Sequence, residues 1–168
     1  HDEQKKWIQN TTQIPSFDIE KFSMKDSKEK IPSAEVGVEL ILNRLATVSG
    51  KRIFLTPNLM NRSTYIPEKL EKRNTPIVLR MPYIDQDIVR YNLPEEIYPE
   101  FIPEAITLRS RFGEYESSFK VDQGTLIYTR KLKMNKGEFP PDSYNELIDF
   151  YKSINKADHV KMVFMNKT

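Results

Sequence analysis

The chain has 168 residues, the size of a single domain and enough to bury a hydrophobic core. Apolar residues make up 38% and charged residues 30% of the sequence, and the formal net charge is only +2 with both signs interspersed. This balance argues against nucleic acid or an anionic membrane surface as a partner. The absence of cysteine excludes thiol catalysis, disulfides and thiolate metal sites.

The beginning of the chain predicts a fragment of a longer polypeptide. It starts His1-Asp2-Glu3 without an initiator methionine and without a signal peptide. Residues 1–14 are mostly polar apart from Trp7 and Ile8, and we expect a linker or a short helix that follows a preceding domain. Residues 15–168 are then expected to form one domain. No apolar run approaches roughly 18 residues, so no membrane span is expected.

Alternating apolar residues predict two long strands in the first quarter of the chain. Phe17 and Ile19 are out of phase by one residue with Phe22 and Met24, which predicts a strand with a bulge near Lys21. Residues 34–42 show the longest alternation in the sequence. Gly50 is expected to turn the chain, and residues 52–55 to return as the second strand of a hairpin.

Residues 56–75 have no sustained period and predict a long loop, of the kind that is functional or packed on a neighbour. Short apolar or alternating runs after it predict further strands, at residues 77–79, 87–93, 106–110, 115–121 and 126–134. Pro99 and Pro103 indicate an extended connection. Gly124 is expected to adopt a positive φ in a tight turn, and Arg130 interrupts the apolar face of the last of these strands.

The last quarter of the chain predicts an amphipathic helix. Pro140 and Pro141 favour a helix start, and Ser143 with Glu146 indicates a capping box, so the helix should begin within residues 140–143. Its apolar residues recur at helical spacing: Tyr144, Leu147, Ile148, Tyr151 and Ile154. A turn is expected at residues 156–158 and a buried terminal strand after it.

About eight strands against one helix, with turn signals every 8–12 residues, predict a mainly β fold. We expect an antiparallel β-sandwich, Ig-like or related, with one C-terminal α-helix followed by a terminal strand.

The residue types needed for catalysis are scarce. A Ser-His-Asp site would need His1 or His159, which lie on an expected tail and at an expected turn. The acids of the segment Asp85-Gln86-Asp87 are too few for calcium and are interpreted as solvated turn residues. No His/Cys spacing suits zinc, and no glycine-rich phosphate loop is present. We therefore expect no enzymatic activity, no metal and no cofactor.

Loop residues are the better candidates for contacts with another domain or a ligand. Asn58, Asn61 and Arg62 lie in an unusual loop segment, where either internal hydrogen bonds or docking of Arg62 on a carboxylate is possible. Tyr65 and Tyr98 lie in segments that look like loops. With Trp7, these residues are the predicted contact residues.

Three collinear stretches resemble one family. They are residues 46–55, residues 57–62, and Phe139-Pro140-Pro141-x-x-Tyr144 leading to Phe150-Tyr151. They resemble the C-terminal domain of unknown function carried by large transglutaminase-like proteins of the bacterial cell envelope. The resemblance covers residues 5–165 approximately.

The resemblance implies that a papain-like transglutaminase core lies upstream, with the family's Cys-His-Asp triad in that core. No position of this chain matches the triad. A periplasmic or cell-envelope location is implied by the resemblance alone. We therefore expect a non-catalytic accessory domain that packs on or positions the upstream core. A β-sandwich module that binds glycan or peptide is the alternative.

Overall fold

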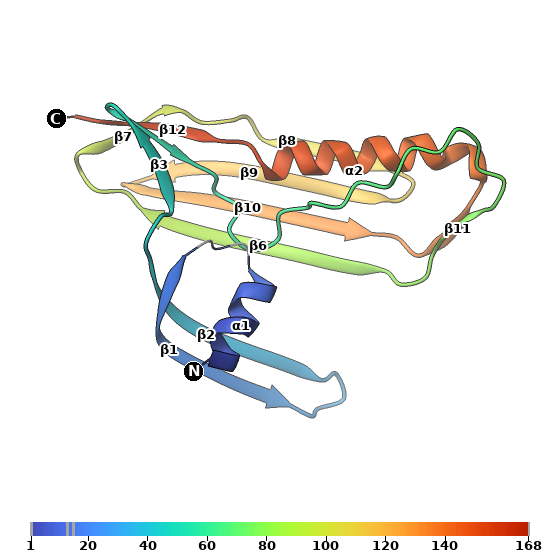
Figure 1. Cartoon of the computed structure of the whole chain (residues 1–168), viewed down its shortest axis with the longest axis horizontal. Coiled ribbons are helices and arrows are strands. Elements are labelled where there is room, and N and C mark those ends of the chain that lie inside the picture. Colours follow the sequence, from blue (N-terminus) through green and yellow to red (C-terminus); the bar gives the residue numbers. More distant parts are fainter. Residues whose placement is uncertain (1, 13, 15, 168) are drawn as a thin grey trace.

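The computed structural model describes residues 2–12, 14 and 16–167 and shows a mainly β chain (Figure 1). Twelve strands lie in this part of the chain, and every recorded strand pair is antiparallel. A C-terminal helix followed by a terminal strand completes it, so the predicted fold class is confirmed. None of the described helices has the length and apolar character needed to cross a bilayer.

The largest body of the fold is a four-stranded sheet in the order β6-β10-β9-β8. Its strands are β6 (Tyr83–Asn92), β8 (Ile106–Ser110), β9 (Gly113–Asp122) and β10 (Thr125–Met134). Apolar residues alternate along β10, so one face of the sheet is buried and the other faces solvent. The β9–β10 turn has Gly124 at φ +77°, as predicted. Only glycine fits position 113, because a Cβ there would lie 2.1 Å from the backbone oxygen of Lys133.

A smaller sheet covers one half of this buried face. Its order is β3-β4-β12-β7, with β3 (Ala46–Ser49), β4 (Arg52–Leu55), β7 (Ile97–Phe101) and β12 (Met162–Asn166). Leu55, Met162 and Phe164 from it pack with Leu126 of β10. The turn at Gly50 and the strand over residues 52–55 agree with the prediction, and their hairpin partner is the short strand β3. The segment around Pro99 forms a strand rather than only an extended connection, because proline is tolerated at the edge position that β7 occupies.

Helix α2 (Tyr144–Asp158) covers the other half of the buried face. Leu147, Phe150 and Ile154 pack with Leu132 and Phe112 from the sheet side. A short 3₁₀ turn, η1 (Pro141–Ser143), precedes α2, and β5 (Ile77–Leu79) pairs with β11 (Gly137–Phe139) nearby. Loop 56–75 contains no helix or strand and runs alongside α2 in Figure 1.

Three details of the predicted helix are corrected by the structure. Ser143 makes no capping hydrogen bond into the helix, because its hydroxyl donates backwards to the carbonyl of Pro140 (2.7 Å). Residues 156–158 are helical rather than a turn. The apolar spacing predicts that Tyr144, Leu147, Ile148 and Tyr151 are all buried. Leu147 and Ile148 are buried, but Tyr144 and Tyr151 are only half-buried.

The N-terminal part forms a separate hairpin. Strands β1 (Phe17–Ser27) and β2 (Ser33–Leu42) pair with each other, with the predicted bulge between Ile19 and Lys21. Helix α1 (Asp2–Thr11) lies beside this hairpin (Figure 1), and the Trp7 and Phe22 rings meet edge to face with centroids 6.0 Å apart. Residues 2–11 are thus helical, while a linker role for the predicted segment 1–14 remains a prediction.

Candidate functional site

A row of polar residues crosses the buried face of the central sheet. Arg130 on β10 lies opposite Asp87 on β6 and opposite Ser117 on β9. This row falls between the core under α2 and the core under the smaller sheet. Arg130, the one charged residue on the buried face of β10, therefore lies at the boundary between the two hydrophobic cores.

Arg130 forms a bidentate ion pair with Asp158 at the last position of α2. Arg130 Nε donates to Asp158 Oδ1 (2.7 Å), and Arg130 Nη2 donates to Oδ2 (3.1 Å). The two side chains are only 1% and 0% exposed. The Tyr115 hydroxyl also donates to Asp158 Oδ1 (2.8 Å). Such planar pairing with an additional donor is the arrangement that a buried carboxylate requires.

Asp87 is the third charged member of this buried charge cluster, which consists of Arg130, Asp158 and Asp87. Its Oδ2 lies 3.4 Å from Arg130 Nη1, and its Oδ1 accepts a hydrogen bond from Asn61 Nδ2 (2.8 Å). Burial raises the pKa of Asp87, although the hydrogen bond from Asn61 and the charge of Arg130 oppose the rise.

Loop 56–75 is fastened to this cluster by its asparagines and backbone. Asn58 Nδ2 donates to Asp158 Oδ1 (3.1 Å), and the backbone N–H of Ser63 donates to Asp158 Oδ2 (2.8 Å). Asn58 Oδ1 also accepts from the backbone N–H of Asn61 (3.2 Å). One carboxylate thus connects the loop, the helix end and the central sheet.

The electrostatics of the cluster favour charged Arg130 and neutral tyrosines. Burial alone would lower the pKa of Arg130, but the hydrogen bonds and charge of Asp158 raise it above its usual value. Burial, followed by the negative charge of Asp158, raises the pKa of Tyr115 to about 12. The pKa of Tyr128 is raised further in the same direction by burial, with Tyr115 and Asp158 adding to it.

The charged groups of the cluster are paired within the fold. The oxygens of Asp158 and Asp87 are occupied by donors from the fold, and the side chain of Arg130 is sealed from solvent. The hydroxyls of Ser117 and Tyr128 are buried beside this network, and both interact with Tyr115.

A family model matches this chain. A domain of unknown function with a solved structure, DUF3858, matches residues 51–164, which is most of the chain. The chain belongs to the DUF3858 family. The matched region contains the central sheet, loop 56–75 and α2, together with β4, β7 and the first three residues of β12 from the smaller sheet; β3 lies outside it.

One solved structure is also similar to this DUF3858 domain. It is the crystal structure of a candidate protease from Parabacteroides distasonis, with 15% sequence identity and a TM-score of 0.49. The match covers 58% of this chain and 19% of that protein, so the chain spans about a fifth of its length. Comparison with curated proteins gave no match.

The predicted contact residues of this DUF3858 family member do not form one surface in the structure. Asn58 and Asn61 lie together at the buried charge cluster, with their side chains engaged inside the fold. Arg62 is half-buried beside them, and its charge acts on Tyr91. Tyr65 is 65% exposed and meets the Tyr151 ring edge to face. Trp7 and Tyr98 lie elsewhere, each 42% exposed. A contact role for these residues remains a prediction.

Sequence reasoning missed the two acids of the cluster. Asp87 begins the predicted strand 87–93, but its interpretation as a solvated acid is wrong, because its side chain points into the buried face of β6. Asp158 was placed in a turn and is the last helical residue. The available signal was Arg130, because an arginine in an apolar strand requires a buried acid as its partner.

The remaining candidates for chemistry have local roles. Nδ1 of His159 lies 2.8 Å from the backbone oxygen of Asn155 at the exposed end of α2. Asp85 lies on the same strand as Asp87 but takes no part in the hydrogen bonds of the cluster. Within the described part of the chain, no group of three or more potential metal ligands is found.

Alkaline titration should report the buried phenols. The pKa values of Tyr91, Tyr115 and Tyr128 are raised by burial above their unfolded value near 10, so the folded state retains protons that the unfolded state loses. Stability should therefore fall as the pH rises above about 10. Tyrosinate absorbance should show that some phenols ionise only at a pH well above 10. The β circular dichroism signal should be lost over the same pH range. One titration of all eight tyrosines near pH 10, with native dichroism throughout, would contradict this.

Proposed function

We propose that this chain is a non-catalytic accessory domain that follows a transglutaminase-like core in a protein of the bacterial cell envelope. In this role it packs on the upstream core or positions it. The observation that supports a structural role is the buried charge cluster, where Arg130 and Asp158 connect loop 56–75 and α2 to the sheet. The resemblance of residues 46–62 and 139–151 to the C-terminal domains of transglutaminase-like proteins supports the context.

The N-terminal hairpin supports packing against an upstream domain. An isolated two-stranded sheet is marginally stable in water, yet β1 and β2 leave apolar side chains uncovered, including Met24 (65% exposed) and Ile41. Together with α1, the hairpin forms the N-terminal part of the described chain. The proposed occupant of this surface is therefore the upstream core of the same polypeptide.

Hydrogen exchange of the natural full-length protein tests this proposal. Backbone amides of β1 and β2 should exchange at least about tenfold more slowly in the full-length protein than in the 168-residue chain alone, because contact with the core stabilises the hairpin. Amides of β9 and β10 serve as the internal control and should be equally protected in both. Equal exchange in the hairpin of both proteins would contradict packing on this surface.

A glycan- or peptide-binding module is the second candidate function. The exposed ring of Tyr65 in loop 56–75 favours it, because exposed aromatic rings provide apolar contact area for ligands. Replacement of Tyr65 by serine should abolish retention on a glycan array or immobilised peptidoglycan. No retention of the unchanged chain would count against glycan binding.

A further inference from the structure

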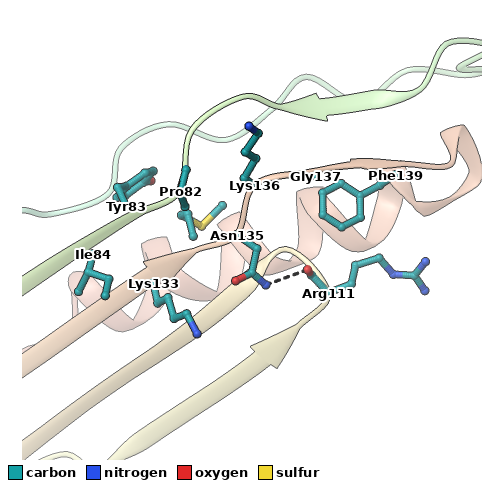
Figure 2. A pocket seen from close by; sticks show the side chains of 10 residues that line it. Pro82, Tyr83, Ile84, Arg111, Lys133, Asn135, Lys136, Gly137 and Phe139 are labelled. Atoms are coloured by element: carbon teal, nitrogen blue, oxygen red, sulfur yellow. Dashed lines mark hydrogen bonds between the residues drawn. The ribbon is translucent and has the colours of Figure 1, made fainter.

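A groove lies at one end of the central sheet, where β10 ends, β6 begins and β11 follows (Figure 2). Its volume is about 700 Å³, and it is open to solvent along one side. Ligand sites of this size usually have a mainly apolar lining with a few well-placed polar groups. Neither the buried charge cluster nor any of the predicted contact residues lines this groove.

The groove has an apolar floor that remains exposed in the folded chain. Pro82, Tyr83, Ile84 and Phe139 line it, together with the buried Met134. Ile84 is 59% exposed although it belongs to a regular strand. Exposed apolar side chains gathered around one depression indicate a contact site more strongly than scattered ones do.

The rim of the groove is positively charged. Arg111, Lys133 and Lys136 are three of its ten described lining residues, and none of the ten is an acid. The chain as a whole has nearly equal numbers of basic and acidic residues. Figure 2 shows the three cationic side chains pointing in different directions around Pro82 and Asn135.

Nearby acids neutralise only part of this charge. Arg111 forms an ion pair with Glu146 (2.9 Å) on α2. Glu114 lies opposite Lys133 in the strand register, but no ion pair is recorded between them in the described chain. Lys133 and Lys136 are therefore the main cationic groups that an anionic ligand would meet.

The shape of the groove is fixed by the backbone around it. The N–H of Asn135 donates to the carbonyl of Phe112 (2.8 Å), and its side-chain Nδ2 donates to the carbonyl of Arg111 (3.1 Å). A Cβ at Gly137 would approach the Phe139 ring to 3.0 Å, so a larger residue at this position would displace the ring from the wall of the groove. A preformed site binds its ligand without a further ordering cost.

We propose that this groove binds an acidic peptide segment in which carboxylates flank an aliphatic or aromatic side chain. The apolar side chain would lie on Ile84 and Pro82, and the carboxylates would meet Lys133, which lies opposite Ile84 in the strand register, and Lys136. An extended peptide fits an open groove, and β11 pairs only with β5 among the described strands, which leaves one strand edge for backbone contacts. This inference does not depend on the presence of an upstream core.

Fluorescence anisotropy of labelled five-residue peptides tests the proposal. The probes are Glu-Phe-Glu-Leu-Glu, Lys-Phe-Lys-Leu-Lys and Glu-Ser-Glu-Ser-Glu, each added to the whole chain. Only the first peptide should bind saturably, because it alone combines negative charge with apolar side chains. The double variant Lys133→Glu/Lys136→Glu should weaken binding about tenfold or more, and Ile84→Ser should also weaken it at least about fivefold.

Two control variants replace residues on the same strands and the same sheet face as Lys133 and Ile84. Lys131→Glu on β10 and Ile88→Ser on β6 (51% exposed) replace residues outside the groove and should leave affinity within about twofold. Circular dichroism shows whether each variant is folded. Equal loss in the control variants, equal binding of all three peptides, or no binding of the first at about 1 mM would overturn the proposal. So would binding of anionic phospholipid vesicles, or of soluble glycan, in place of that peptide.

Discussion

Replacement of Asp158 by alanine is expected to lower the free energy of unfolding by about 3–5 kcal/mol. The change leaves Arg130 buried beside only the more distant Asp87, and it removes the acceptor of Asn58, Ser63 and Tyr115. Urea denaturation followed by circular dichroism measures the loss. We also expect faster hydrogen exchange in residues around Ser63, because the loop loses its contact with the helix end.

Asp149→Ala is the control for this prediction. Asp149 is an exposed acid on the same helix, so its replacement should change the free energy of unfolding by less than about 0.5 kcal/mol. A loss below about 1 kcal/mol for Asp158→Ala would show that Arg130 finds other compensation, and that Asp158 does not hold the helix and loop together.

Replacement of Leu147 by alanine is expected to cost about 2–5 kcal/mol. Leu147 is 5% exposed and belongs to the core formed by α2, β9 and β10, where the truncated side chain would leave a cavity. The midpoint of urea denaturation should fall without a change in slope. Lys152→Ala, on the exposed side of α2, is the matched control and should be nearly neutral. A neutral Leu147→Ala would mean that α2 does not bury this face.

Local patterns explain the parts of the fold that the sequence predicts well. The phase change between Ile19 and Phe22 specifies the bulge in β1, because a strand can shift its phase only by an extra residue. Gly124 specifies the β9–β10 turn, because its φ of +77° is one that side chains rarely adopt. The apolar spacing after Pro141 likewise specifies α2.

Non-local pairing explains what the sequence does not show. Arg130 visibly needs an acid, but the chain contains 24 acidic residues, and only the fold selects Asp158 and Asp87. Residues 156–158 look like a turn by local composition. They are helical in the structure, where the final turn places Asp158 against Arg130 and Asn58.

The candidate site shows the same division. Asn58 and Asn61 are recognisable as unusual loop residues, yet their partners lie 100 and 26 positions away along the chain. The groove beside Ile84 has no sequence signature, because its lining comes from the ends of several strands. Its apolar and basic residues look ordinary until the fold brings them together.

A double-mutant cycle on Arg130 and Asp158 tests most directly whether the buried charges serve the fold. Arg130→Met and Asp158→Leu should each destabilise by about 3–5 kcal/mol, because each leaves one buried charge without its main partner. The double variant should lose no more than either single variant, which gives a coupling energy of about 3 kcal/mol or more. Additive losses, with the double variant destabilised by the sum of the two, would contradict the structural role assigned to this pair.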